Sequence, residues 1–284
     1  MSAEQPGAGA ASPLSSGTTT AVIGAGVMGE TLISGLVRGG HDPSLLLVVE
    51  KRVDRAQVLA DRYGVRVVDD LAAVAVADTV ALVVKPQDMS EVLAEVRDHV
   101  VPGQLVVSLA AGITTAFVEA RLQPGVAVVR VMPNTPALVD EGMAAISAGS
   151  HCDVEHLARA EAMLAVTGKV LRVPEKQQDA VTAISGSGPA YLFFVVEAMI
   201  EAGVHLGLPR STATELVVQT VVGSATLLRE TGEHPTVLRE QVTSPGGTTA
   251  AAIRELEDHK VRAAFLTAME AARNRSVALA RDED

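Results

Sequence analysis

The sequence predicts an α/β protein in which a doubly wound parallel sheet is followed by an all-helical domain. Six short apolar runs alternate with helical stretches up to about residue 134, and strand signals stop after about Pro174. Runs of Val and Leu without polar alternation are typical of strands that are covered on both faces. Their alternation with helices favours right-handed crossovers, of which the strand order 3-2-1-4-5-6 is the commonest outcome.

The individual elements follow from apolar periodicity and from the Gly and Pro residues between them. Strands are predicted over 20–23, 45–49, 65–68, 79–84, 105–108 and 127–131, and helices over 26–38, 54–63 and 88–99, with a short Ala-rich helix from Asp70. The C-terminal helices are predicted over 175–184, 189–206, 211–231, 236–241, 248–257 and 261–280. We therefore expect a disordered tail over 1–18, an α/β domain over 19–179 and a helical domain over 180–284.

Composition excludes several classes of partner. The chain has 23 Lys and Arg against 34 Asp and Glu, a net charge of −11, which argues against nucleic acid and anionic membranes as partners. Charged residues in the apolar stretch 189–208, such as Glu197 and Glu201, argue against a membrane span. The start of the chain lacks the pattern of a secretory signal, and the single cysteine, Cys152, cannot form an internal disulfide. These features predict a cytoplasmic protein, and no metal site is expected because the candidate ligands around Cys152 lack a fourth member.

Two predicted helices are apolar on more than one side. The segments 189–196 and 216–222 carry Leu, Phe and Val around most of the helix circumference. Such helices either form the centre of their domain or face another subunit. Since about 100 residues is a small domain for so much buried helix, we expect an intertwined homodimer.

A glycine fingerprint joins the first strand to the first helix. It consists of Gly24, Ala25, Gly26, Val27, Met28 and Gly29. In this position a GxGxxG pattern is typical of Rossmann-type dinucleotide binding. The first glycine permits the tight turn, the second lets the backbone approach the pyrophosphate, and the third lets the helix pack closely on the strand. An ordinary tight turn between a strand and a helix is the alternative.

The end of the second strand gives contradictory indications about the cofactor. Glu50 could accept a hydrogen bond from the ribose 2′-hydroxyl of NAD and would repel the 2′-phosphate of NADP. However, Lys51, Arg52 and Arg55 follow at once and could pair with a phosphate. The choice between NADH and NADPH therefore stays open, and these cations could also be an ordinary solvated helix start.

Three further strand ends are expected to border the same crevice, since ligands of open α/β sheets bind at the carboxyl ends of the strands. The candidate cofactor-binding residues at these ends are Val84, Lys85, Pro86, Ala110, Ala111 and Asn134. Small residues such as Ala110 and Ala111 would let a flat nicotinamide ring approach the backbone. Simple strand termination is the alternative.

In the helical domain, a turn rich in glycine and hydroxyl groups is the candidate substrate site. Its candidate residues are Val242, Ser244, Gly246, Gly247, Thr248 and Thr249. Such a turn exposes consecutive backbone N–H groups beside hydroxyl groups, which suits a small carboxylate. No lysine occurs over 177–259, so a lysine base is not expected there, and a plain loop between two helices is the alternative.

These motifs together resemble those of the pyrroline-5-carboxylate reductase family over about residues 19–280. The most specific are Met132-Pro133-Asn134-Thr135-Pro136, Ser185-Gly186-Ser187-Gly188-Pro189-Ala190-Tyr191 and Thr243-Ser244-Pro245-Gly246-Gly247-Thr248-Thr249. The resemblance implies reduction of 1-pyrroline-5-carboxylate to L-proline by NADPH or NADH, and a helical dimerisation domain with active sites made from both subunits. Larger rings of dimers also occur in this family.

The resemblance also implies roles for individual residues. The cofactor would contact Gly24, Gly26 to Gly29, Val84 to Pro86, Ala110 and Ala111. Thr249 matches the threonine beside the ring nitrogen of the substrate, and Ser244 with the amides of 246–248 would hold the carboxylate. Thr249 and Ser244 are therefore the candidate catalytic residues. Glu50 departs from the small or hydroxyl residues of members that favour NADPH, so cofactor preference stays open.

Two other functions are considered. A β-hydroxyacid-type dehydrogenase also has a Rossmann-type domain followed by helices, but it would need a catalytic lysine that the long helix 189–208 lacks. A non-catalytic NAD(P)-sensing protein would keep the glycine fingerprint and lose the hydroxyl-rich turn, which is intact here.

Overall fold

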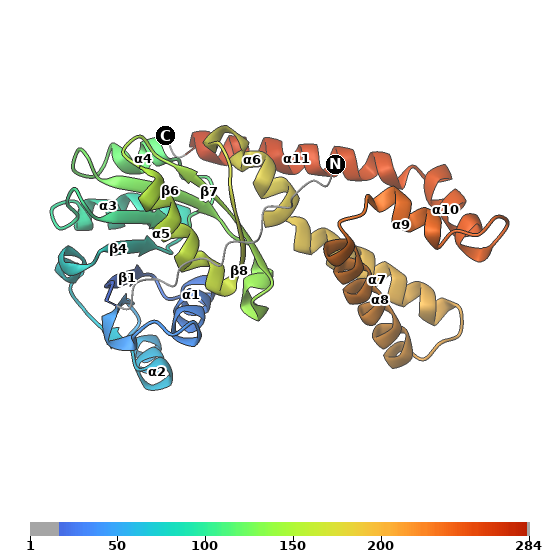
Figure 1. Cartoon of the computed structure of the whole chain (residues 1–284), viewed down its shortest axis with the longest axis horizontal. Coiled ribbons are helices and arrows are strands. Elements are labelled where there is room, and N and C mark those ends of the chain that lie inside the picture. Colours follow the sequence, from blue (N-terminus) through green and yellow to red (C-terminus); the bar gives the residue numbers. More distant parts are fainter. Residues whose placement is uncertain (1–16, 283–284) are drawn as a thin grey trace, which may run out of the picture. The chain divides into compact units, whose positions relative to one another are not determined.

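The computed structural model describes residues 17–282, so most of the predicted tail over 1–18 lies outside the described residues. Contacts divide the chain into two compact units, one formed by the residues up to Gly186 together with those from Arg273, the other by Ser187–Ala272. Figure 1 shows their helices and strands along the chain. The predicted division into functional domains at residues 179 and 180 stays a prediction.

The first unit contains an eight-stranded sheet in the order β3-β2-β1-β4-β5-β6-β7-β8. Its first six strands are β1 (Thr20–Ile23), β2 (Leu46–Val49), β3 (Arg66–Val67), β4 (Thr79–Leu82), β5 (Leu105–Ser108) and β6 (Ala127–Met132). All pairings among these six strands are parallel. The six predicted strands and their order are therefore confirmed.

Two further strands were missed by the sequence analysis. Strand β7 (Gly142–Ala148) pairs antiparallel with β6, and β8 (Gly168–Arg172) pairs parallel with β7, so the sheet is not wholly parallel. The sequence of β7, GMAAISA, has a single β-branched residue, Ile146, and therefore lacks the usual strand composition. Strand β8 carries charges at the edge of the sheet, where polar residues are common.

Helices cover both faces of this sheet. Their bounds are α1 (Val27–Arg38), α2 (Val53–Tyr63), α3 (Met89–Val96), α4 (Thr115–Glu119), α5 (Val154–Leu164) and α6 (Gln178–Val181). Helices α3 and α4 contribute to one buried apolar cluster, and α1, α2 and α5 to the other. Residues 21–23 of β1 and 80–82 of β4 alternate between the two clusters, which explains why these residues are apolar. The first residues of the two strands, Thr20 and Thr79, are buried hydroxyl residues.

Short 3₁₀ segments connect these elements. They are η1 (Pro43–Leu45), η2 (Leu71–Val76), η3 (Pro86–Asp88), η4 (Thr135–Val139), η5 (Ala165–Thr167) and η6 (Glu175–Gln177). The Ala-rich helix expected from Asp70 is therefore a 3₁₀ segment, in which the Asp70 side chain accepts a hydrogen bond from the Ala72 N–H. A π-helical turn, η7 (Thr182–Gly186), ends the first stretch of this unit.

The second unit is helical, as predicted. It contains α7 (Gly188–His205), α8 (Arg210–Thr231), α9 (Pro235–Gln241) and α10 (Thr248–Asp258). Helix α11 (Val261–Asp282) begins in this unit, and its residues from Arg273 group with the first. Helices α7 and α8 leave large apolar side chains exposed, among them Phe193, Phe194 (72 % exposed) and Leu216.

One described stretch passes a composition test for membrane spans. The helical run Glu175–His205 has a mean hydropathy of 1.4 over its most apolar window, and little of that window is buried. Exposed apolar helices of this kind also occur where subunits pack together. The expectation that the chain has no membrane span stays a prediction.

Candidate active site

The parallel register brings four strand ends into line in the first unit. Ile23 pairs with Leu82, Leu82 with Ser108, and Ser108 with Arg130. The next residues extend the alignment, because the Val83 N–H donates to the Ile23 carbonyl (2.8 Å) and the Leu109 N–H to the Leu82 carbonyl (2.9 Å). The loops after β1, β4, β5 and β6 therefore follow one another along the carboxyl edge of the sheet.

The three glycines of the fingerprint meet three different spatial demands. Gly24 has φ +88°, and a Cβ on it would lie 2.6 Å from the Val83 carbonyl oxygen. A Cβ on Gly29 would collide with the Gly24 carbonyl oxygen, whereas a Cβ on Gly26 would meet nothing within 4 Å. The first and third glycines are therefore required by packing within the chain, and the second leaves backbone open to a ligand.

The start of α1 suits an anionic group. Gly26 is the N-cap residue and supplies no side chain to the free N–H groups of the first turn. These N–H groups and the helix dipole favour a phosphate at this position. The open space at Gly26 and the uncapped helix start therefore fit the pyrophosphate of a dinucleotide.

Glu50 has partners within the protein. Its carboxylate accepts hydrogen bonds from the Ala25 N–H (3.1 Å) and the Arg52 N–H (3.0 Å), and its side chain is 10 % exposed. Lys51 donates to Glu91 at 2.9 Å, and the Arg52 guanidinium is exposed. Arg55 donates to the Ala25 carbonyl oxygen at 3.0 Å and pairs with Glu30. Among the cations Lys51, Arg52 and Arg55, Arg52 alone has a side chain that no carboxylate in the described part of the chain holds at hydrogen-bond distance.

The residues after β4 and β5 present different groups at the edge. Val84 and Pro86 are partly buried, and Lys85 is exposed at the start of η3. Ala110 is buried in one of the apolar clusters, whereas Ala111 is exposed. Ala110 could therefore contact a cofactor through its backbone only.

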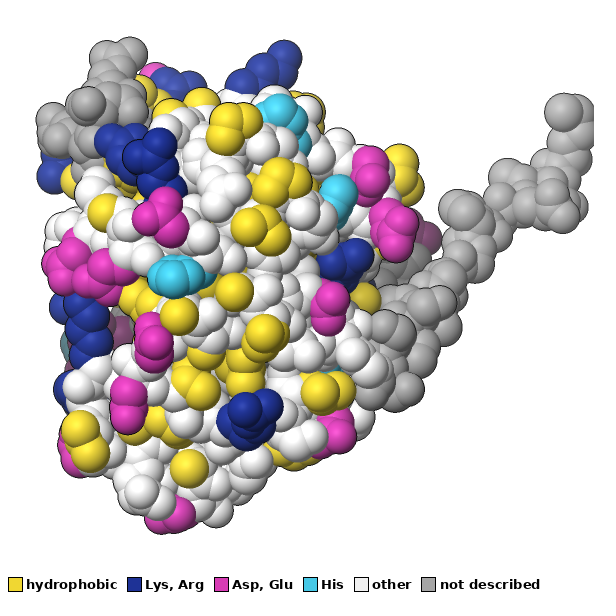
Figure 2. All heavy atoms as spheres, turned by 90° about the vertical axis from the view of Figure 1, so that its left-hand side faces the viewer, with side chains coloured by type: hydrophobic (Ala, Val, Ile, Leu, Met, Phe, Trp, Pro, Cys, Tyr) yellow, Lys and Arg dark blue, Asp and Glu magenta, His cyan; other side chains and the backbone are white. Residues whose placement is uncertain are grey.

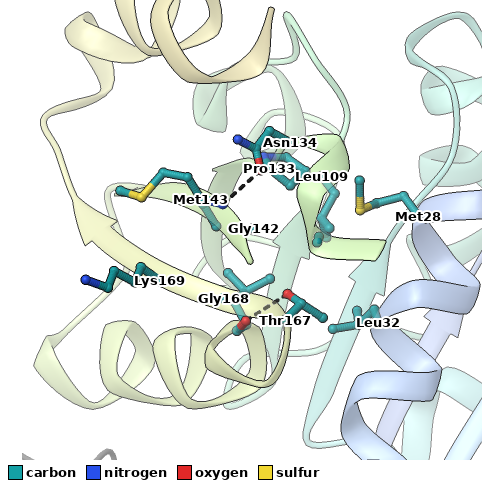
Figure 3. A pocket seen from close by; sticks show the side chains of 13 residues that line it. Met28, Leu32, Leu109, Pro133, Asn134, Gly142, Met143, Thr167, Gly168 and Lys169 are labelled. Carbon is teal, nitrogen blue, oxygen red and sulfur yellow. Dashed lines mark hydrogen bonds between the residues drawn. The ribbon is translucent and has the colours of Figure 1, made fainter. Parts of the chain in front are cut away.

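Asn134 forms part of the wall of a small pocket in the first unit (Figure 3). Its Oδ1 accepts from the Met143 N–H (2.8 Å), and its Nδ2 donates to the Ser185 carbonyl oxygen (3.1 Å). The side-chain amide thus ties the loop after β6 to β7 and to the π-helical turn. The other lining residues include Met28 from the first turn of α1, Leu109 and Pro133 from the loops after β5 and β6, and Lys169 from β8. Met143 and Lys169 could not be found as pocket residues because the strands that carry them were missed.

The hydroxyl-rich turn of the second unit lies between α9 and α10. The Gly247 N–H donates to the Ser244 carbonyl oxygen (3.0 Å), and Gly246 has φ +68°. Gly247 is the N-cap residue of α10 and provides no side chain to the first-turn N–H groups. Val242, Ser244, Gly246 and Thr248 are exposed, and Gly247 and Thr249 are partly exposed.

Hydrogen-bond donors in this turn are available to a ligand. Within residues 17–282, the hydroxyl groups of Ser244, Thr248 and Thr249 form no hydrogen bond, whereas the Thr243 hydroxyl donates to the Arg239 carbonyl oxygen at 2.6 Å. The Gly247 N–H is already used by Ser244, and the N–H groups of Gly246, Thr248 and Thr249 are among those available to a ligand. A carboxylate would complete their hydrogen bonds and would be favoured by the helix dipole.

Other chemistry has less support. The described part of the chain contains no group of three or more His, Cys, Asp or Glu side chains placed to hold a metal ion. Cys152 is partly buried, and burial raises the pKa of its thiol, although hydrogen bonds to backbone groups oppose this. A buried thiol with a raised pKa is a poor nucleophile.

Comparison with known proteins decides the family. The chain is 49 % identical over 263 residues to a pyrroline-5-carboxylate reductase of Corynebacterium melassecola, with 91 % of this chain and 97 % of the relative covered. The chain belongs to the pyrroline-5-carboxylate reductase family. A reductase of the same name from Mycobacterium tuberculosis is 43 % identical over 279 residues, covering 90 % of this chain and 95 % of the relative.

Family models and solved structures agree with this assignment. The model described as pyrroline-5-carboxylate reductase dimerisation matches residues 175–279, and the model described as NADP oxidoreductase coenzyme F420-dependent matches residues 19–112. The reductase structure from Coxiella burnetii superposes with a TM-score of 0.89 at 38 % identity, covering 92 % of this chain and 98 % of that one. A Plasmodium falciparum pyrroline carboxylate reductase structure with NADP bound gives 0.83 at 26 %, covering 93 % and 99 %. The predicted family and fold class are thus confirmed for this reductase, and the residue roles stay predictions.

Proposed function

We propose that this reductase transfers hydride from NADPH or NADH to the C=N bond of 1-pyrroline-5-carboxylate, giving L-proline, with the cofactor at the carboxyl edge of the sheet and the substrate at residues 242–249. Relatives that are 43–49 % identical to this chain carry the name pyrroline-5-carboxylate reductase, which supports this reaction. The observation that carries the residue assignment is the set of unpaired hydroxyl and N–H donors at the start of α10. Hydroxyl and N–H donors of this kind can bind the carboxylate of an imino acid through hydrogen bonds.

The carboxylate of the substrate is assigned to Ser244 and to the N–H groups of Gly246, Thr248 and Thr249. The sequence alone suggested the amides of 246–248, but the Gly247 N–H donates to Ser244 within the turn. The role of Gly247 is then to leave room for the Ser244 hydroxyl, because a Cβ on Gly247 would collide with that hydroxyl in its present position. Val242, exposed beside the turn, would supply apolar contact to the ring.

Thr249 is assigned as the hydrogen-bond partner of the ring nitrogen. A cyclic imine becomes a good hydride acceptor once its nitrogen is protonated, and solvent can supply that proton. The protein then needs to orient the ring and to stabilise the developing amine, which by itself removes several kcal/mol from the barrier. The stretch 177–259, which includes this turn, has no lysine to act as a base.

For the cofactor, the residues that would hold it fit a dinucleotide. The N–H groups at the start of α1 and the open backbone at Gly26 would hold the pyrophosphate. Lys85, Pro86 and Ala111 are the exposed or partly exposed groups at the next strand ends. When bound, the reduced nicotinamide supplies the hydride.

The assembly is proposed to be a homodimer built on the helical region, with a larger ring of dimers as a further level of assembly. The family model that matches 175–279 describes dimerisation, and α7 and α8 expose the apolar side chains that an interface would bury. The face in Figure 2 shows basic, acidic and apolar side chains interspersed, and the net charge is −11. These features favour neither nucleic acid nor an anionic membrane as a partner, and a cytoplasmic location fits a chain with a single cysteine.

The proposal is tested by following oxidation of NADPH and of NADH with and without 1-pyrroline-5-carboxylate, and by identifying L-proline as product. We expect oxidation that depends on the imine. Thr249→Ala should lower kcat/KM for the imine about 10- to 100-fold, because one hydrogen bond to the reacting nitrogen is lost. Thr249→Ser should restore most of the rate.

A matched control comes from α11. The Thr267 hydroxyl donates to the Ala263 carbonyl oxygen within its own helix, so Thr267→Ala should leave kcat/KM nearly unchanged. An unchanged kcat/KM in Thr249→Ala would contradict the role of Thr249. The absence of imine-dependent oxidation in the wild-type protein would contradict the function itself.

A further inference from the structure

The peptide backbone of Ala25, the second residue of the glycine fingerprint, is held from both sides by side chains. Glu50 accepts from its N–H at 3.1 Å, and the Nε of Arg55 donates to its carbonyl oxygen at 3.0 Å. Ala25 itself is fully buried. Both polar groups of this residue are therefore used before any cofactor binds.

A second set of contacts holds Arg55 in place. Its guanidinium pairs with Glu30 in the first turn of α1, and Glu30 also accepts hydrogen bonds from Arg62 and from the Tyr63 hydroxyl, each at 2.9 Å. Three side chains of α2 thus converge on one carboxylate of α1. Glu30 and Arg55 are partly buried and Arg62 is exposed, and a partly buried network of this kind favours one geometry of the side chains that it joins.

We infer that Glu50 and Arg55 form a clamp on Ala25 that positions the dinucleotide loop, and that Glu50 is not the residue that selects NADH or NADPH. This inference rests on the proposed function only in requiring that the loop binds one of these cofactors. Glu50 and Arg55 are positioning residues, because they act on the cofactor through the backbone of the loop.

The hydrogen bonds and the low exposure of the Glu50 carboxylate support this assignment. Its two oxygens accept the N–H groups of Ala25 and Arg52, and little of its surface is exposed. A ribose hydroxyl could at most share one of these oxygens, because the carboxylate could not turn toward it without leaving the contacts that shape the loop. Its charge is also partly compensated by the Arg52 guanidinium at 3.6 Å, which weakens its repulsion of a 2′-phosphate.

The inference predicts a parallel loss of affinity for both cofactors. In Glu50→Gln, an NH₂ group would face backbone N–H donors, so the loop loses part of its support. Arg55→Met keeps the aliphatic stem and removes the bond to the Ala25 carbonyl. We expect each variant to raise the Kd of NADH and of NADPH about tenfold, with the ratio of the two Kd values changed by less than about twofold.

The experiment measures these Kd values by isothermal titration calorimetry and amide hydrogen exchange over 24–29 in the ligand-free protein. Both variants should exchange faster than wild type there. Glu161→Gln, which breaks the ion pair of Glu161 with Arg172 on α5 and β8, is the matched control and should change neither quantity. Thermal unfolding checks that each protein is folded, and if Glu50→Gln does not fold, Arg55→Met decides alone.

Two outcomes in the variants would overturn the inference. One is a change of about tenfold or more in the NADH to NADPH ratio for Glu50→Gln, which would make Glu50 the selecting residue. The other is unchanged exchange over 24–29 and unchanged Kd values in Arg55→Met. A wild-type protein that binds both cofactors without reducing the imine would contradict only the proposed function, whereas one that binds neither would overturn both.

Discussion

The glycine fingerprint of the first unit and the hydroxyl-rich turn of the second are both loops that lead into a helix, but their local environments differ. In the fingerprint, Ala25 is buried and its backbone is held by Glu50 and Arg55. In the turn, Ser244 and Thr248 are exposed and their hydroxyl groups are unpaired within the described chain. The first loop is shaped by contacts within the protein, whereas the hydroxyl groups of the second stay unpaired within the described chain.

Because of this difference, substitutions in the two loops should affect different properties of the protein. Changes to the contacts that hold the fingerprint in shape should alter stability and cofactor affinity together, because the same contacts serve both, whereas a change at the open backbone of Gly26 should alter affinity alone. Changes in the turn should alter catalysis and leave stability almost unchanged. The variants of Gly29, Gly26 and Ser244 test that separation, and the variants of Glu175 and Glu30 test the contacts that stabilise the first unit.

The largest combined effect on stability and cofactor affinity is expected for Gly29→Ala. A Cβ there collides with the Gly24 carbonyl oxygen, so the loop has to open. We expect a loss of about 1–3 kcal/mol in the free energy of unfolding and a fall of about 100-fold in cofactor affinity. Gly26→Ala is the matched variant: its Cβ meets nothing within 4 Å, so stability should hold while cofactor affinity falls. Unchanged cofactor affinity in Gly26→Ala would contradict the placement of the pyrophosphate.

A second test removes the partly exposed partner of a buried charge in the first unit. Glu175 accepts hydrogen bonds from the Thr115 N–H and hydroxyl, each at 2.7 Å, and faces the buried Arg130 at 3.4 Å. Glu175→Ala leaves the Arg130 charge without its partner and should cost about 3 kcal/mol of unfolding free energy, measured by urea denaturation. Glu175→Gln keeps an acceptor for Thr115 and should cost less. Equal losses in the two variants would show that the charge of Glu175 is unimportant.

Acid should weaken the contacts of Glu30. Burial raises the pKa of this carboxyl, but the Tyr63 hydrogen bond and the guanidinium groups of Arg55 and Arg62 outweigh it, so the pKa is lowered overall. A lowered folded-state pKa stabilises the protein above the unfolded pKa of about 4.3, and that stability is lost as pH falls through the folded value. The difference in unfolding free energy between wild type and Glu30→Gln should therefore shrink below about pH 4. A difference that does not change with pH would contradict this.

The smallest change in stability is expected in the turn. Ser244→Ala removes an exposed hydroxyl that is unpaired within the described chain, so the free energy of unfolding should change by less than about 0.5 kcal/mol. The same variant should lower kcat/KM for the imine about tenfold, because a donor to the carboxylate is lost. A large loss of stability would remove the contrast between the two loops.

The sequence predicted the elements whose residues carry strong local signals. Strands such as β1 and β4 were found because both of their faces are buried and every position after the first threonine is apolar. Strand β7 was missed because its small residues, with Ile146 as the single β-branched one, form a strand only through pairing with β6. Tertiary pairing of this kind leaves little trace in a local window.

The candidate site was predictable in part for the same reason. Gly24, Gly26 and Gly29 are set by backbone demands that a short motif expresses. The partners of Glu50 depend on how the end of β2 lies against the loop after β1, so its contact with Ala25 could not be read from spacing. The two hydrogen bonds of Asn134, to Met143 and Ser185, also join segments that are separate in the sequence.

The central claim is that orientation of a protonated imine drives the reduction, without a titrating side chain of the protein. The most direct test is the pH dependence of kcat/KM for 1-pyrroline-5-carboxylate at saturating NADPH, divided by the protonated fraction of the free imine. We predict a corrected profile that is flat across the neutral range in the wild-type protein and in Thr249→Ser. A residual step or bell in that profile would reveal an ionising protein group and contradict the account.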